Sequence, residues 1–162
     1  MTRLLAPIVF GAVLLVSAPL AARASLGVYE SWAAFKDPKP LRCYAIAKAQ
    51  GTAPAPAYAT VSNWPDRKVR GAVYFALSRD IADKSAVRLV VGAVRFELVA
   101  KGRNAWAKDA QGDAAIVAAL RSAARMSVSA KSAKGSNFTD RYALGGAATA
   151  MDAATVGCAQ RR

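Results

Sequence analysis

The sequence contains no histidine and only two cysteines among its 162 residues. Without histidine, there can be no catalytic triad with an imidazole base and no metal site with an imidazole ligand. The sequence also lacks a Cys-x-x-Cys pair, a Gly-x-Gly-x-x-Gly segment and a phosphate-binding loop of the Gly-Lys-Ser/Thr type. These absences disfavour thioredoxin-like redox chemistry and the common nucleotide-binding motifs. We therefore expect no cofactor and no metal centre.

The first 24 residues have the pattern of a signal peptide. A single basic residue, Arg3, precedes an apolar run over residues 4–20, and Ala22-Arg23-Ala24 has the small-x-small pattern of a cleavage site. The run is short for a membrane-spanning helix, which needs about 20 apolar residues. We therefore expect cleavage after Ala24 and a periplasmic protein. A retained membrane anchor is the alternative.

Residues 25–162 are expected to form a single domain, since their number suits one hydrophobic core. Removing Arg3 and Arg23 from the 23 basic residues leaves 21 against 10 acidic ones, a net charge of +11. No second apolar run of spanning length occurs in this part. We therefore expect no transmembrane span in the mature chain, which would be soluble or attached to a membrane surface.

The two cysteines, Cys43 and Cys158, both lie in the predicted mature part. In an oxidising compartment an even number of cysteines favours a disulfide, and two cysteines allow only one intramolecular pairing. Such a bond would close a loop of about 115 residues and hold the C-terminal segment in place, with a chain-entropy stabilisation of about 4–5 kcal/mol. Two separate buried thiols are the alternative.

Alternation of apolar and polar residues predicts a mainly β, antiparallel domain that is sandwich-like or barrel-like. The expected strands are residues 28–35, 41–47, 58–64, 69–79, 87–91, 94–101, 126–131 and 138–144. Gly92-Ala93 should form a hairpin turn between two of them. The proline-rich segment over residues 51–57 should be an exposed connector.

Two helices complete the predicted fold, one mid-chain and one short helix at the C-terminal end. Residues 114–125 carry an apolar stripe at helical spacing, and Asp113 is the expected N-cap. Asp109 is assigned to a turn. Gly145-Gly146 should turn the chain from the last strand into the terminal helix, because glycine tolerates a sharp backbone turn.

Positive charge is the main functional signal, since a net charge of this size favours anionic partners. In a cell envelope these would be anionic lipids or polymers. We expect no nucleic-acid partner, because export separates the protein from nucleic acid. Strand and helix phase point four arginines outward as a candidate anion-binding surface: Arg70, Arg88, Arg95 and Arg121. The alternative is a solvated basic surface without a dedicated partner, since no basic run exceeds two residues.

Two further groups of residues are candidate sites. Trp32, Trp64 and Trp106 would form an aromatic binding face, or else pack in the core or at a sheet edge. The segment SAKSAKG, Ser129–Gly135, supplies serines and lysines in close order, as a serine–lysine hydrolase requires. A solvated hairpin loop explains the same residues. A pocket that holds one of these lysines beside a buried serine would favour the hydrolase.

Several segments resemble the invasion-associated locus B family of bacterial envelope proteins. They are RCYAIA around Cys43, FELVAKGRNAWAKDAQGDAAIVAAL over residues 96–120 and SAKGSNFTDRYALGGAATAMDAA over residues 132–154. The resemblance covers roughly Leu26–Cys158. Its most specific parts are Ala105-Trp106, Lys134-Gly135, Thr139-Asp140-x-Tyr142-x-Leu144 and the glycine before the last helix. The chain departs from the family pattern at Ala147, where members usually carry a bulky aromatic residue.

The resemblance implies an exported, β-rich envelope protein without enzymatic activity, and it supplies no catalytic residues. We therefore interpret the sequence as a periplasmic, envelope-associated protein, with outer-membrane association or secretion as variants of that location. The first alternative is a surface adhesin or an accessory of host-cell invasion. The second alternative is a small serine–lysine hydrolase. The sequence does not determine the ligand or the oligomeric state.

Processing of the leader gives the first testable prediction. The exported protein should begin at Ser25, because the apolar run and the motif that ends at Ala24 direct cleavage between these two residues. Intact-mass measurement of the exported protein should give the mass of residues 25–162. A mass that retains residues 1–24 would show that the leader remains as an anchor.

Overall fold

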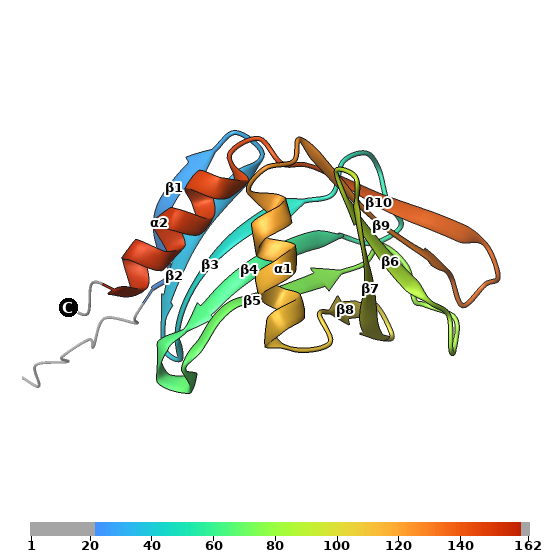
Figure 1. The fold of residues 1–162 in the computed structure, drawn as a ribbon, viewed down its shortest axis with the longest axis horizontal. Coiled ribbons are helices and arrows are strands. Elements are labelled where there is room, and N and C mark those ends of the chain that lie inside the picture. Colours follow the sequence, from blue (N-terminus) through green and yellow to red (C-terminus); the bar gives the residue numbers. More distant parts are fainter. Residues whose placement is uncertain (1–21, 160–162) are drawn as a thin grey trace, which may run out of the picture.

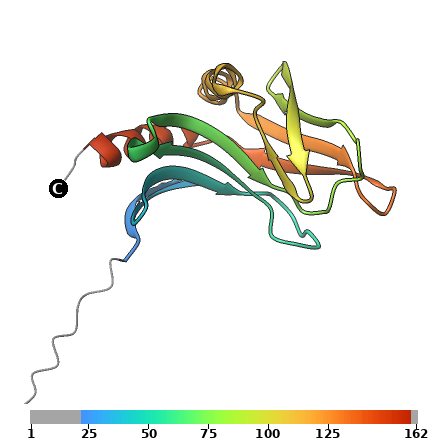
Figure 2. The same cartoon turned by 90° about the horizontal axis from the view of Figure 1, so that it is seen from below.

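The computed structural model describes residues 22–159, so the apolar run over residues 4–20 lies outside the described part of the chain. The described residues form a ten-stranded antiparallel sheet with one mid-chain helix and one C-terminal helix, which confirms the predicted fold class (Figure 1). The sheet bends strongly across its strands (Figure 2). One hydrophobic cluster contains residues from both halves of the sheet.

The strands in chain order are β1 (Ala24–Tyr29), β2 (Trp32–Pro38), β3 (Leu41–Lys48), β4 (Tyr58–Trp64), β5 (Val69–Ala76), β6 (Val87–Val91), β7 (Val94–Lys101), β8 (Asn104–Trp106), β9 (Arg125–Lys131) and β10 (Asn137–Ala143). The helices are α1 (Ala110–Leu120) and α2 (Ala147–Ala159), and a short 3-10 helix, η1 (Pro65–Arg67), joins β4 to β5. The order across the sheet is β1-β2-β3-β4-β5-β8-β7-β6-β9-β10. Within residues 22–159, no helix combines the length and the apolar composition needed to cross a membrane.

The core lies on one face of the first strands. In β3 the side chains of Cys43, Ala45 and Ala47 are all buried, as a period of two predicts. Trp32 extends this core from β2, and its indole Nε1 donates a 3.0 Å hydrogen bond to the carbonyl oxygen of Ala143. The first hairpin and the end of β10 therefore lie side by side, although 111 residues separate them in the chain.

Helix α2 packs closely on this face because its contact surface consists of small residues. A Cβ atom added to Gly157 would lie 2.5 Å from a methyl carbon of Leu26. At Gly146, where the chain enters the helix with φ +82°, an added Cβ would lie 1.9 Å from the carbonyl oxygen of Tyr29. The other buried residues of the helix include Ala150 and Ala154. A larger residue at position 146 would collide with the backbone, whereas one at position 157 would require the Leu26 side chain to move, so glycine at both points permits the close approach.

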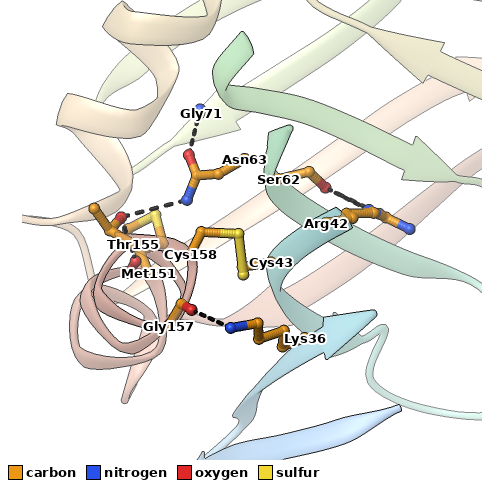
Figure 3. Close-up of a disulfide and its surroundings, with 10 residues drawn as sticks. All are labelled: Lys36, Arg42, Cys43, Ser62, Asn63, Gly71, Met151, Thr155, Gly157 and Cys158. Carbon is orange, nitrogen blue, oxygen red and sulfur yellow. Dashed lines mark hydrogen bonds between the residues drawn. A yellow bond between two sulfur atoms is a disulfide. The ribbon is translucent and has the colours of Figure 1, made fainter. Parts of the chain in front are cut away.

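The predicted disulfide between Cys43 and Cys158 is confirmed, with 5.7 Å between the two Cα atoms. It joins the centre of β3 to the last turn of α2 (Figure 3). Beside it, Lys36 Nζ donates a 2.9 Å hydrogen bond to the carbonyl oxygen of Gly157. A cation at the carbonyl end of a helix also complements the helix dipole. The bond and the lysine together fix the end of α2 on the sheet.

The predicted strand over residues 28–35 is wrong, because this segment crosses a tight hairpin. Tyr29 pairs with Trp32, so Glu30 and Ser31 form the turn between β1 and β2. Glu30 has φ +50°, in the left-handed region that turn positions of this kind require. Neither residue is a glycine or asparagine, and the sequence therefore lacks the usual signal for such a turn.

The predicted bounds of the first helix, residues 114–125, are also wrong. Asp109 is the N-cap, since its carboxylate accepts a 2.8 Å hydrogen bond from the backbone N–H of Gly112. Asp113 lies inside the first turn, and its Oδ1 accepts a 2.8 Å hydrogen bond from the backbone N–H of Val73 in β5. Burial in this position raises the pKa of the Asp113 carboxyl. Asp113 therefore attaches the helix to the sheet instead of capping it.

The motif Thr139-Asp140-x-Tyr142 serves the fold. Asp140 is buried, and its carboxylate accepts a 2.9 Å hydrogen bond from the backbone N–H of Ser78, which follows β5. Tyr142 is fully buried, with its ring centroid 6.3 Å from that of Phe75. Burial, reinforced by the charge of Asp140, raises the pKa of the Tyr142 phenol. These residues connect β10 with the end of β5 across the core.

Removal of the disulfide gives a second prediction. The double variant Cys43→Ala/Cys158→Ala should lose about 4–5 kcal/mol of unfolding free energy, since the unfolded chain regains the entropy that a closed loop of this length removes. Urea unfolding of the oxidised protein and of the variant measures the difference. Reduced wild-type protein is the matched control and should unfold near the midpoint of the variant. Equal midpoints for oxidised and reduced protein would contradict the prediction.

Candidate functional site

The face of β3, β4 and β5 that points away from α2 carries aromatic and polar side chains. Strand alternation directs Cys43 and Asn63 toward the helix, whereas Arg42 and Ser62 lie on the opposite side (Figure 3). On the same side, Thr60 of β4 is paired with Ile46 of β3 and with Tyr74 of β5.

A groove of about 600 Å³ lies on this open face. We call it the aromatic groove and define it by its lining residues Arg23, Arg42, Tyr44, Ile46, Tyr58, Thr60, Ser62, Trp64, Ala72 and Tyr74. Two smaller hollows, of about 370 and 400 Å³, adjoin it at its ends. The first shares Arg42 and Trp64 with the groove, and the second shares Ile46 and Tyr58. The three hollows are therefore neighbours over β2–β5.

Arg42 is held in place within the aromatic groove. Its Nη2 and Nε atoms donate hydrogen bonds of 2.9 and 3.3 Å to Ser62 Oγ. Its guanidinium carbon lies 4.1 Å from the ring centroid of Tyr44 and 5.1 Å from that of Trp64, at distances typical of cation–π contacts. Among residues 22–159 the ion pairs are Arg23–Asp37 and Arg121–Asp152. Arg42 thus has no carboxylate partner within the described chain.

Three tyrosines line the groove as hydrogen-bonding groups. The rings of Tyr58 and Tyr74 lie 6.2 Å apart, and the Tyr74 hydroxyl is hydrogen-bonded to Asn104 Oδ1. Burial raises the pKa of Tyr74, with a further rise from Tyr58. Burial also raises the pKa of Tyr44, reinforced by the charge of Asp37. The phenols of Tyr44 and Tyr74 therefore keep their protons at neutral pH and do not repel an anion.

Thr60 lies at the base of the aromatic groove and is only 2% exposed. Its Oγ1 atom has no hydrogen-bond partner within the described part of the chain. An unpartnered buried hydroxyl costs free energy, and such groups are uncommon in folded proteins. Because Thr60 lines a groove, a bound molecule can supply the hydrogen-bond partner that its hydroxyl lacks and so offset this cost.

Arg23 covers one end of the aromatic groove. Its Nε lies 2.9 Å from Asp37 Oδ1, and its guanidinium carbon lies 5.7 Å from the ring centroids of both Phe35 and Tyr44. The predicted cleavage after Ala24 would remove this arginine. β1 would keep its pairing from Ser25 onward, since Ser25 is already paired with Phe35. Cleavage would therefore open the groove without removing a strand.

The four arginines predicted to bind anions are all exposed, but they lie in two groups. Arg70 and Arg121 line a hollow of about 390 Å³ between α1, α2 and the sheet. There Arg121 Nη2 forms a 2.7 Å ion pair with Asp152 on α2. Arg88 and Arg95 lie on the neighbouring strands β6 and β7, where Arg88 is paired across the strands with Glu97. Their binding of anions stays a prediction.

The serine–lysine segment spans the end of β9 and the tip of the hairpin that leads to β10. The Ser132 hydroxyl is buried and lies 2.9 Å from that of Ser136, while Lys131 and Lys134 are exposed. Lys131 lines a hollow of about 360 Å³ together with Ser129, but Ser129 is only half-buried and its hydroxyl is hydrogen-bonded to Thr139. Within residues 22–159 no lysine of this segment is placed beside a buried serine in a pocket, which favours the solvated hairpin loop.

The three tryptophans are candidates from the sequence, but most of the aromatic groove is not predicted from it. Trp32 belongs to the core, whereas Trp64 lines the groove. Trp106 pairs with Tyr74 at the edge of the same face. The available signal was the alternation in β3 and β4, where large aromatic and polar residues occupy every second position. Alternation alone does not show which strands are neighbours, and the groove requires that information.

The geometry defines a disulfide-linked antiparallel β domain with an open aromatic groove. A solved structure with a similar fold is that of invasion associated protein B from Bartonella henselae. The TM-score is 0.63, and the match covers 85% of this chain and 99% of that chain at 17% sequence identity. At this identity the similarity shows a shared fold. No protein-family model and no curated protein sequence matches the chain.

The charge around Trp64 gives a third prediction. Arg42 and Arg67 lie over this ring, at 5.1 and 4.9 Å from its centroid, so the local potential should attract anions. Iodide should therefore quench tryptophan fluorescence more strongly than caesium does, and Trp64→Phe should reduce the difference. Arg67→Gln should reduce it in part. A Trp64→Phe variant with the quenching ratio of the wild type would contradict this prediction.

Proposed function

We propose that this chain is an exported, envelope-associated binding protein of the invasion-associated B type, which acts without catalysis. The observation that carries the proposal is the shared fold, which extends over 85% of the chain and 99% of its solved counterpart. The segments that resemble the invasion-associated locus B family support the same assignment. So does the departure of the serine–lysine tip from the arrangement that a hydrolase needs.

Export to an oxidising compartment is supported by the disulfide. A bond between Cys43 and Cys158 persists in the periplasm or outside the cell, whereas the cytosol keeps thiols reduced. The leader pattern over residues 1–24 supports the same location from the sequence. The protein would thus act among the lipids and polymers of the envelope.

The partners proposed for the mature chain are anionic envelope lipids or polymers. A net charge of +11 attracts them at long range, while screening at physiological salt limits each arginine to nearby charges. Each basic residue close to an anionic membrane surface contributes about 1 kcal/mol. Binding should therefore be modest and strongly dependent on salt.

Vesicle binding gives the fourth prediction. The exported protein should co-sediment with vesicles that contain phosphatidylglycerol but not with vesicles of phosphatidylcholine alone, and high salt should release it. Because the four arginines lie in two groups, two double variants with the same net charge can be compared. Arg70→Gln/Arg121→Gln and Arg88→Gln/Arg95→Gln each remove two positive charges from a different face. The pair that faces the membrane should lower binding about tenfold or more, at about 1 kcal/mol for each residue.

Two results would count against this prediction. Equal binding to both vesicle types would show that charge does not drive association. Binding that does not respond to salt would lead to the same conclusion, and the positive charge would then serve solubility.

A further inference from the structure

We propose that the aromatic groove is a binding site for an acidic oligosaccharide, namely a stretch of a sugar polymer that carries carboxylate groups. The inference rests on the proposed function, because it takes the anionic envelope polymer as the partner class. Beyond the proposed function, it names the binding site, the chemistry by which the polymer is recognised and the residues that recognise it. None of the four arginines predicted from the sequence belongs to this site.

The rings of the groove suit the flat faces of sugars. Trp64, Tyr58 and Tyr74 line the same depression, and the last two rings lie 6.2 Å apart. A pyranose ring exposes an apolar face of C–H groups, which packs well on an aromatic ring, and hydroxyls around its edge. Tyrosine provides both an apolar ring and a polar tip, so it meets both kinds of surface. The groove thus offers ring faces for stacking and phenols for hydrogen bonds.

Arg42 supplies recognition of the acidic group. Its planar guanidinium suits a carboxylate, which it can bind through two parallel hydrogen bonds. Ser62 and the rings of Tyr44 and Trp64 already hold this guanidinium in place, so little conformational freedom is lost on binding. Arg67, whose guanidinium carbon lies 4.9 Å from the centroid of the Trp64 ring, adds positive charge nearby.

Asp37 is the acidic residue that competes with such a ligand. It lies directly opposite Arg42 in the pairing of β2 with β3, on the same face of the sheet. In the described chain its carboxylate binds Arg23 instead, at 2.9 Å. Loss of Arg23 on cleavage would leave Asp37 without this partner. A ligand carboxylate would then compete with Asp37 for the guanidinium of Arg42.

Thr60 supplies an independent indication that a polar ligand occupies the groove. Its buried hydroxyl lacks a hydrogen-bond partner within residues 22–159, and it lies among the lining residues of the groove. A sugar hydroxyl both donates and accepts, so it can satisfy Thr60 in either direction. An acyl chain would leave the same hydroxyl unpaired. This difference favours a sugar over the tail of a lipid.

The form of the depression favours an extended chain. The two neighbouring hollows share lining residues with the groove, so a row of three adjoining hollows lies over four strands. An extended oligosaccharide can contact several such subsites at once. The end near Val28, Ala33 and Ile46 is mainly apolar, whereas the end near Arg42 is charged. The acidic units should therefore bind near β2, β3 and Trp64.

The test is calorimetric titration of the exported protein with hexagalacturonate, and with maltohexaose as a neutral α-1,4-linked hexasaccharide. Hexagalacturonate should bind at least about tenfold more tightly, through its carboxylates. Arg42→Gln should weaken binding of hexagalacturonate by about tenfold or more. Arg125→Gln removes the same charge from an exposed position at the start of β9 and should leave the affinity within about twofold. Asp37→Asn should increase the affinity, because it removes the competitor for Arg42.

Thr60→Val separates a binding role from a structural one. The valine keeps the branched shape and removes the unpartnered hydroxyl, so Tm should rise by about 2–5 °C. The same variant should bind hexagalacturonate several-fold more weakly, since the ligand loses a hydrogen bond. Weaker binding together with higher Tm is the result expected of a functional hydroxyl. Unchanged affinity would remove Thr60 from the site.

The outcomes for the groove and for the proposed function are distinguishable. Absence of hexagalacturonate binding, or equal losses in Arg42→Gln and Arg125→Gln, would overturn the groove as the site. Salt-sensitive binding to anionic vesicles would then still support envelope association. If vesicle binding fails and hexagalacturonate binds through Arg42, the groove stands and the membrane-lipid part of the proposed function falls.

Discussion

The close packing of α2 on the first strands determines how the rest of the molecule is arranged. Glycine at positions 146 and 157 and alanine at position 150 let the helix approach the backbone of the sheet, and the disulfide from Cys158 to Cys43 holds it there. The helix therefore covers the face of β3 that carries small residues. The opposite face, with its larger aromatic and polar side chains, remains open and forms the groove. One contact thus determines both the covered side and the open side of the same strands.

Much of the fold could be predicted from the sequence because it depends on local patterns. Alternation located β4 at its observed bounds, and Gly92-Ala93 marked the turn between β6 and β7. The first hairpin was missed because Glu30 adopts a positive φ without a glycine or asparagine to signal it. The start of α1 was misplaced because two aspartates four residues apart both suit an N-cap, and only the tertiary contact with Val73 distinguishes them.

The groove illustrates why a binding face is harder to predict than a strand. Its residues come from β3, β4 and β5, and its edge from β8, which is far from β5 in the chain but next to it in the sheet. The net charge of the sequence indicates exposed arginines such as Arg70 and Arg121 instead. Arg42 lies in a strand that otherwise contributes to the core, and its role depends on ring contacts with Tyr44 and Trp64. Such contacts follow from pairing and register, which a single sequence does not specify.

The sequence separation of the disulfide would also set the order of events in the proposed export, if the chain crosses the membrane from its N-terminal end. Cys43 would then enter the oxidising compartment 115 residues before Cys158, and β4–β10 and α1 lie between them. During this interval the sequence offers no other cysteine with which Cys43 can pair. Its thiol must therefore remain reduced, or form a transient mixed disulfide with another molecule, until the intervening strands have arrived. Intramolecular oxidation can then produce only one product, so this protein needs no isomerase to correct its own cysteine pairing.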